Sequence, residues 1–185
     1  MKKALLIICA ALMLFAAGCK KDAKATVEHS VDIAYYADTG AVPGAAFKAG
    51  ETVSEGFEEN ENMFVVENGA RSFASSGDYY YYFDIDSPPF TVDAVVSFTD
   101  CYGFDIGTVS IEVTKVLEAQ GIKYNEHEPA NEELFFLPGA GTVYSEEDSA
   151  SGRKIERTVV ECTSLKHKLI FVFEENALCA AACFK

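Results

Sequence analysis

Apolar and polar side chains alternate along much of the chain beyond residue 26, and a period of two is typical of β-strands with one buried face. In residues 27–35, for example, Val27, Val31 and Ile33 fall on alternate positions. The same pattern predicts further strands at residues 63–67, 79–85, 90–99, 154–163 and 167–174. These segments predict a protein built mainly on an antiparallel sheet.

The segment 167–174 is apolar at both odd and even positions, with Leu169 and Phe171 on one side and Ile170 and Val172 on the other. A strand that is apolar on both sides is buried on both faces. We therefore expect this strand to lie in the interior of its sheet, joined to the strand before it by a hairpin turn at residues 164–166.

Residues 106–120 fit two structures. Val109, Ile111 and Val113 alternate and are β-branched, which favours a strand. Apolar residues also recur at helical spacing between positions 106 and 117, and Gly121 stands where a glycine commonly ends a helix. We expect the helix, followed by a glycine stop and then a strand, with a strand throughout as the alternative.

The alanine-rich segment 176–183 favours a short C-terminal helix, because alanine has the highest helix propensity. The predicted fold class is therefore α+β, an antiparallel sheet with one covering helix and a short C-terminal helix. An all-β sandwich is the alternative. The 49% content of hydrophobic residues is typical of a folded globule rather than a disordered stalk.

The first 19 residues have a different character, with Lys2 and Lys3 ahead of an apolar run at 4–17, then Gly18 and Cys19. About 14 residues at ~1.5 Å each form a helix of roughly 21 Å, which is shorter than a ~30 Å hydrocarbon core. This leader resembles the signal peptide and lipobox of bacterial lipoproteins. The resemblance implies cleavage before Cys19 and attachment of acyl chains such as palmitate to its thiol. Ala16 stands where that family usually has leucine, so cleavage without lipidation is the alternative.

The resemblance also implies a domain plan and a location. Residues 1–18 would be the signal peptide, 19–26 the lipidated cysteine with a polar tether, and 27–185 a single globular extracytoplasmic domain. A lipid anchor would hold that domain in the bacterial cell envelope. Lys20 occupies the position where aspartate signals inner-membrane retention in this family, so outer-membrane delivery is implied if the host is Gram-negative.

The chain is strongly acidic, with 29 acidic against 15 basic residues and a formal net charge of −14. Such a surface repels phosphate backbones, which argues against a nucleic-acid partner and leaves the lipid as the contact with the membrane. The acidic residues gather near positions 51–67 and 126–148 without the alternating pattern of a calcium-binding loop. We interpret them as solvated loops.

Beyond the leader, four cysteines remain in what would be an oxidising compartment: Cys101, Cys162, Cys179 and Cys183. All four are disulfide candidates, and three connectivities are open. A helix would make a bridge between Cys179 and Cys183 awkward, so we expect each of them to pair with Cys101 or Cys162. A zinc–thiolate site is the competing interpretation, although it normally shows two close cysteine pairs.

Catalytic motifs are absent from the sequence. His29, His127 and His167 are scattered, and no nucleophile elbow, zinc-protease helix or phosphate-binding glycine loop accompanies them. His127 lies between Glu126 and Glu128, which is typical of a surface histidine among carboxylates. The sequence therefore predicts no catalytic residue, no metal site and no cofactor, although distant residues can form a site without leaving a motif.

The run of tyrosines at 79–82 is the best indication of binding. In a strand, Tyr80 and Tyr82 would face away from Tyr79, Tyr81 and Phe83, so one set packs in the core and the other offers flat, amphipathic area. Tyr80 and Tyr82 are thus the candidate ligand-binding residues. The expected function is a non-catalytic binding or interaction module for a protein, a glycan or a cell-wall component. An envelope hydrolase or accessory protein with a non-obvious active site is the alternative.

Overall fold

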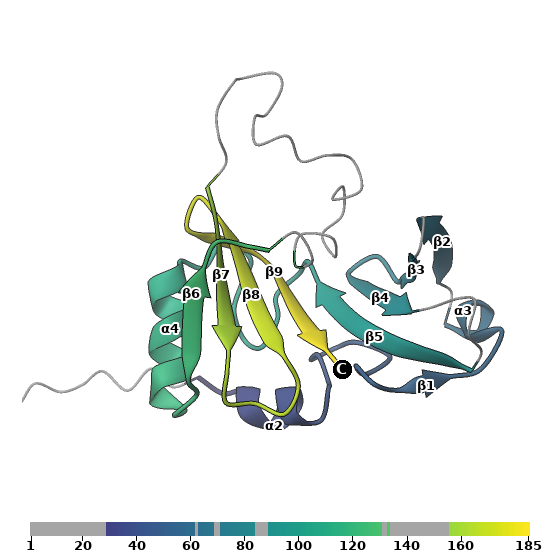
Figure 1. Ribbon diagram of the computed structural model, residues 1–185, viewed down its shortest axis with the longest axis horizontal. Helices are drawn as coiled ribbons and strands as arrows, with labels where there is room; N and C mark the ends of the chain where they lie inside the picture. The colour runs from purple at the N-terminus through teal and green to yellow at the C-terminus, as the bar shows by residue number, and fades with distance from the viewer. Residues whose placement is uncertain (1–28, 62, 69–70, 84–88, 131–132, 134–155) are drawn as a thin grey trace, which may run out of the picture.

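The computed structural model describes residues 29–61, 63–68, 71–83, 89–130, 133 and 156–185. The leader, Cys19 and the tether lie outside these residues, so their predicted roles stay predictions. Within them the fold is dominated by an antiparallel sheet and contains three helices (Figure 1).

The sheet has nine strands, eight of them in the order β2-β3-β4-β5-β9-β8-β7-β6, while β1 pairs with one end of β5. Every pairing is antiparallel. The strands are β1 Thr52–Val53, β2 Phe64–Asn68, β3 Arg71–Ser75, β4 Tyr79–Phe83, β5 Phe90–Ser97, β6 Tyr124–His127, β7 Arg157–Cys162, β8 Leu169–Glu174 and β9 Ala177–Phe184.

Most of the strands expected from alternation are confirmed. Strand β8 lies between β7 and β9, and five of its six residues are buried, as its two apolar sides predicted. Strands β7 and β8 pair antiparallel as a hairpin around residues 163–168, which confirms the turn expected there.

The helix expected within residues 106–120 is confirmed as α4, Ser110–Ala119. Gly121 follows its end at φ +73°, and Ile122 N–H donates to the Leu117 carbonyl at 2.9 Å. This is the hydrogen bond of a glycine-terminated helix end. Strand β6 begins three residues after Gly121, so the predicted order of helix, glycine stop and strand is correct.

The expected strand at residues 27–35 is wrong wherever the structure describes it: residues 29–32 form no strand, and from Ile33 the chain forms helix α2, Ile33–Asp38. The Asp32 side chain accepts a hydrogen bond from Tyr35 N–H at 3.0 Å and caps the first turn. Gln120, at the end of α4, bonds to Ile33 N–H and to the Val31 carbonyl, which fixes the approach to α2. The period of two was misleading because Ile33 and Ala37, four apart, are the buried residues of this segment.

The expected C-terminal helix is also wrong, because residues 177–184 form strand β9 between β5 and β8. Glu175 and Asn176 have φ of 50° and 68°. Two successive residues with positive φ form the tight turn that joins β8 to β9 as a hairpin. Pairing on both sides of β9 thus overrides the helix propensity of its alanines.

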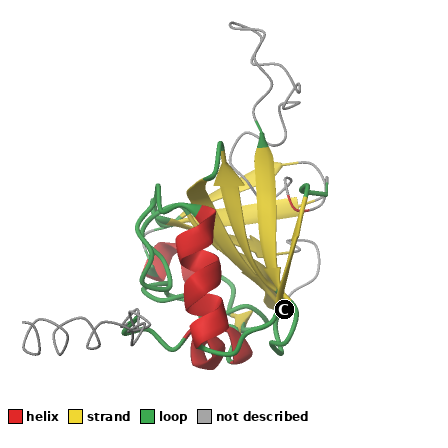
Figure 2. Ribbon diagram, turned by 90° about the vertical axis from the view of Figure 1, so that its left-hand side faces the viewer, coloured by secondary structure: helices red, strands yellow, loops and turns green. Residues whose placement is uncertain are grey.

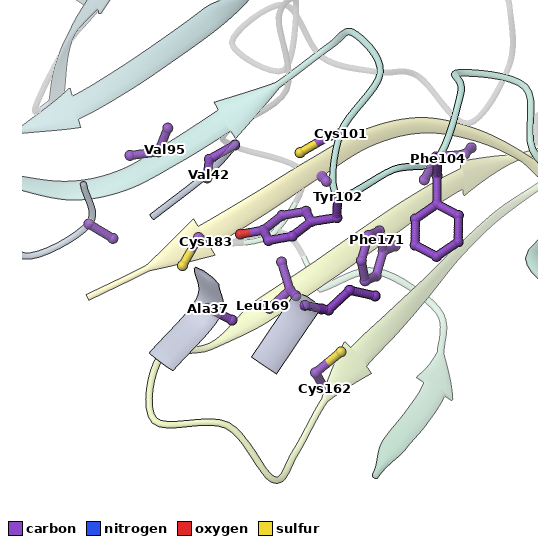
Figure 3. Packing of buried hydrophobic residues seen from close by; sticks show 14 of the residues in the cluster. Ala37, Val42, Val95, Cys101, Tyr102, Phe104, Cys162, Leu169, Phe171 and Cys183 are labelled. Atoms are coloured by element: carbon purple, nitrogen blue, oxygen red, sulfur yellow. The ribbon is translucent and has the colours of Figure 1, made fainter. Parts of the chain in front are cut away.

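The first face of the sheet carries the main core and the described helices, which include α3, Phe57–Asn60. Ile33 from α2, Phe57 from α3 and Leu117 from α4 all pack into it. Figure 2 shows α4 running along one side of the sheet. In Figure 3, Tyr102 lies among buried residues from several strands, and its hydroxyl donates to the Ala41 carbonyl at 3.0 Å.

The opposite face, called the second face below, has its own buried apolar cluster. Its members are Tyr82, Ala94, Val96, Val159, Ile170, Val172, Ala180 and Ala182, each at most 5% exposed. All of them lie on strands, and no described helix contributes to this cluster. Three alanines on adjacent strands make the centre of the face shallow, with larger side chains on either side.

Candidate functional site

The second face ends in a group of charged side chains where β6, β7 and β8 meet. Glu161 on β7 stands opposite Asn125 on β6 and Ile170 on β8, so it shares the face of Ile170. His127, two residues after Asn125, points to the same side. Lys168, the residue just before β8, also belongs to this group, because its Nζ lies 3.8 Å from Glu161 Oε2. The buried apolar cluster of the second face is thus bordered by charged side chains at the β6 end of the sheet.

Glu133 joins this group from the segment after β6, and its side chain is only 5% exposed. Lys168 Nζ donates to its Oε1 at 2.8 Å, and Ala130 N–H donates to its Oε2 at 2.9 Å. Burial acts to raise the pKa of Glu133, but these hydrogen bonds outweigh it and the pKa is lowered overall. The side chains of His127, Glu133, Glu161 and Lys168 form what is called the ionic cluster below.

The tautomer of His127 follows from its surroundings. Its Nδ1 lies 2.8 Å from the Glu128 carbonyl oxygen, which can only accept, so Nδ1 carries a proton. In the neutral ring Nε2 is then an acceptor. That atom is buried and has no hydrogen-bond partner among the described residues. Glu161 Oε2 lies 3.4 Å from it, within ion-pair range but not aligned for a hydrogen bond.

With a neutral imidazole, the two carboxylates and one ammonium give the ionic cluster a formal charge of −1. One ligand atom each from His127, Glu133 and Glu161 lie within 4.8 Å of one another. These three residues could hold a metal ion. Among the residues that the structure describes, the contacts within the cluster include no hydroxyl nucleophile.

The tyrosines of β4 divide between the faces as alternation predicted. Tyr79 and Tyr81 pack on the first face, and their hydroxyls bond to the backbone of Pro43 and Ala46. The candidate ligand residues, Tyr80 and Tyr82, lie together on the second face.

The two candidate tyrosines differ in exposure. Tyr82 is 5% exposed and belongs to the floor of the second face. Burial, with a smaller contribution from Tyr80, raises the pKa of Tyr82 above its ordinary value. Tyr80 is half-buried and its ring meets Phe98 edge to face, with 5.1 Å between centroids. Tyr80 is therefore the one placed to touch a ligand without rearrangement of the sheet.

The cysteines are distributed over both faces and are free thiols. Cys162, Leu169 and Cys183 stand side by side on β7, β8 and β9. Two strand spacings of ~4.8 Å separate the two cysteines, more than the ~7 Å that a disulfide allows between Cα atoms. Cys179 packs on the second face, opposite Cys101, Cys162 and Cys183.

Burial raises the pKa of the Cys101 and Cys162 thiols to about 12 each, and Cys183 adds to the effect on Cys101. These groups are therefore neutral at physiological pH and are poor nucleophiles or metal ligands. Figure 3 shows Cys101 and Cys183 near Tyr102. Pairing of Cys183 with Cys101 stays a prediction, whereas the strand register separates Cys183 from Cys162, and the sheet separates Cys179 from both of its expected partners.

The structure does not bring the three histidines together. His29 Nε2 lies 2.5 Å from the Tyr102 carbonyl oxygen, and its ring stacks on Phe104. His167 Nδ1 lies 3.0 Å from the Phe184 carbonyl oxygen. Only His127 has carboxylate neighbours within ion-pair range among the described residues.

Sequence reasoning singled out His127 but missed Glu133, Glu161 and Lys168. No spacing in the sequence links these residues, because strand register and the segment after β6 bring them together. A correct prediction that β6 pairs with β7 would have placed Glu161 opposite Asn125, two residues from His127.

Comparison with known proteins gives no match to any protein family, to any curated protein or to any solved structure. Across the part of the chain that the structure describes, no helix is long and apolar enough to span a membrane.

Proposed function

We propose that the chain is a lipid-anchored lipoprotein of the bacterial cell envelope whose domain is a non-catalytic binding module. The anchor is Cys19, which follows the apolar leader at the position that the lipobox requires. Two or more acyl chains would give stable anchoring, whereas one chain binds a membrane only marginally. If the host is Gram-negative, Lys20 favours the outer membrane as the destination.

The half-buried Tyr80–Phe98 pair at the edge of the second face is the observation that supports the binding role. The apolar residues of the second face are each at most 5% exposed, so they support this pair from beneath, and the ionic cluster lies at the other end of the face. Binding sites commonly combine an apolar surface with a few placed polar groups. With one sheet and the described helices on its first face, the architecture also supports the α+β class over a two-sheet sandwich.

The partner would be a protein, a glycan or a cell-wall component, reached in the envelope. Tyrosine supplies rigid area that packs on a sugar ring or an apolar side chain while its hydroxyl stays hydrated. The acidic domain makes nucleic acid and the anionic membrane surface poor partners.

Photo-crosslinking in intact cells tests this proposal. A photoreactive amino acid replaces Tyr80 in the whole chain, and the matched control carries it in place of Tyr35, which is 65% exposed on α2. In parallel, purified sacculi are used to capture wild-type, Tyr80→Ala and Tyr35→Ala proteins. The proposal expects an adduct or sacculus retention that depends on position 80 and not on position 35. Equal results at the two positions would contradict it.

The ionic cluster favours a second candidate, an envelope hydrolase, because an imidazole beside two carboxylates is a common arrangement in general acid–base catalysis. We rank it below the binding module because no described residue places a nucleophile in contact with the cluster. If the protein hydrolyses a sacculus or peptide substrate and His127→Ala abolishes that hydrolysis, the hydrolase becomes the preferred function.

A further inference from the structure

We propose that His127, Glu133 and Glu161 form a binding site for a single Zn²⁺ ion at the edge of the second face, with the Lys168 ammonium as the competing cation. The three ligands lie at the opposite end of the second face from Tyr80, so zinc binding there does not depend on a ligand at Tyr80.

The ligand chemistry favours zinc. The site offers one imidazole nitrogen and two carboxylate oxygens, whereas Ca²⁺ and Mg²⁺ prefer oxygen ligands throughout. Zinc sites that keep an open position use three protein ligands of this kind with bonds of ~2.0–2.2 Å. One ligand atom each from His127, Glu133 and Glu161 lie within 4.8 Å of one another. His127 Nε2 lies 3.4 Å from Glu161 Oε2, whereas Glu133 Oε2 lies 3.8 Å from Nδ1 of the same ring, so a rotation of the Glu133 side chain is needed to bring its carboxylate to an ion on Nε2.

The orientation of His127 is the second, independent observation. A metal-binding histidine commonly donates its other ring N–H to a carbonyl, which fixes the tautomer. Here Nδ1 is held 2.8 Å from the Glu128 carbonyl, and the remaining lone pair is on Nε2. That atom is buried without a hydrogen-bond partner among the described residues, beside Glu161. Buried acceptors are normally satisfied, and a cation at this point would satisfy Nε2.

Access and charge are compatible with an ion. The side chains of His127 and Glu161 are 33% and 31% exposed, so the cluster lies at the surface although Nε2 itself is covered. Lys168 is 39% exposed, and its Nζ lies 2.8 Å from Glu133 Oε1. When its ammonium rotates out, a divalent ion balances the two carboxylates. Removal of the Lys168 charge should therefore strengthen zinc binding.

Isothermal titration of the whole chain with Zn²⁺ alone tests the site, using protein purified in mild detergent without a histidine tag and stripped with a chelator. We expect one ion per chain. His127→Ala and Glu161→Gln should each weaken binding at least tenfold, and Lys168→Met should strengthen it. The matched controls Glu126→Gln and His167→Gln remove the same group types outside the cluster and should bind as the wild type does.

Two results would overturn the proposal. One is wild-type protein that binds no zinc, or binds it with an affinity that His127→Ala and Glu161→Gln leave unchanged. The other is a thiolate-to-cobalt charge-transfer band when Co²⁺ replaces zinc, because that band would assign the ion to cysteines. Far-ultraviolet circular dichroism of each variant separates loss of the site from loss of the fold.

Discussion

Replacement of Ile170 by alanine tests whether the second face is a true core. Ile170 is 1% exposed on β8, with Glu161 and Ala182 as its cross-strand neighbours. The matched variant is Leu169→Ala, one residue away on the first face and 0% exposed. Truncation of a buried Leu or Ile to Ala costs about 2–5 kcal/mol through lost burial and the cavity left behind. Both variants should therefore lose about 3 kcal/mol of unfolding free energy.

Urea denaturation followed by circular dichroism measures this loss. With a slope of about 2 kcal/mol per molar urea, a loss of 3 kcal/mol lowers the midpoint by about 1.5 M. In a domain of this size the melting temperature should fall by roughly 6–12 °C. Surface substitutions usually change stability by less than ~0.5 kcal/mol. A change that small for Ile170→Ala, beside a large one for Leu169→Ala, would show that the second face is not buried in solution.

Two further predictions concern the charged edge and the β8–β9 turn. Because the folded-state pKa of Glu133 is lowered, the stability it contributes is present above its unfolded value near 4.5 and is lost as pH falls through the folded value. In Lys168→Met the urea midpoint should fall less between pH 6 and pH 3 than it does in the wild type. An equal fall in both proteins would contradict the role of Lys168 in lowering the pKa of Glu133. Asn176→Ala should cost about 1–2 kcal/mol, since alanine tolerates φ of +68° poorly. Asn176→Gly should cost less, and thermal melts that rank the two in the opposite order would refute the turn.

The sequence was sufficient to predict those elements whose own residues show a clear apolar pattern or a recognisable helix end. Strand β8 was apolar on both sides, and α4 ended at Gly121, so both could be placed from the sequence. Helix α2 was missed because six residues give too short a run for helical periodicity to outweigh alternation. The Asp32 cap was the available sign.

The C-terminal strand could not be predicted from its own composition. Alanines at 180–182 favour a helix in isolation, and only the turn at Glu175–Asn176 commits them to a hairpin between two partner strands. The ionic cluster could not be predicted from the sequence for a related reason. Lys168 and Glu133 are 35 residues apart and meet through tertiary structure alone.

The central claim, a domain anchored in the envelope through Cys19, is tested most directly by mass spectrometry of the mature chain extracted from membranes. The account predicts a chain that lacks residues 1–18 and carries diacylglycerol on Cys19, together with release of a Cys19→Ser variant from the membrane fraction. An unmodified N-terminus at Met1, or a chain cut elsewhere and free of lipid, would contradict it.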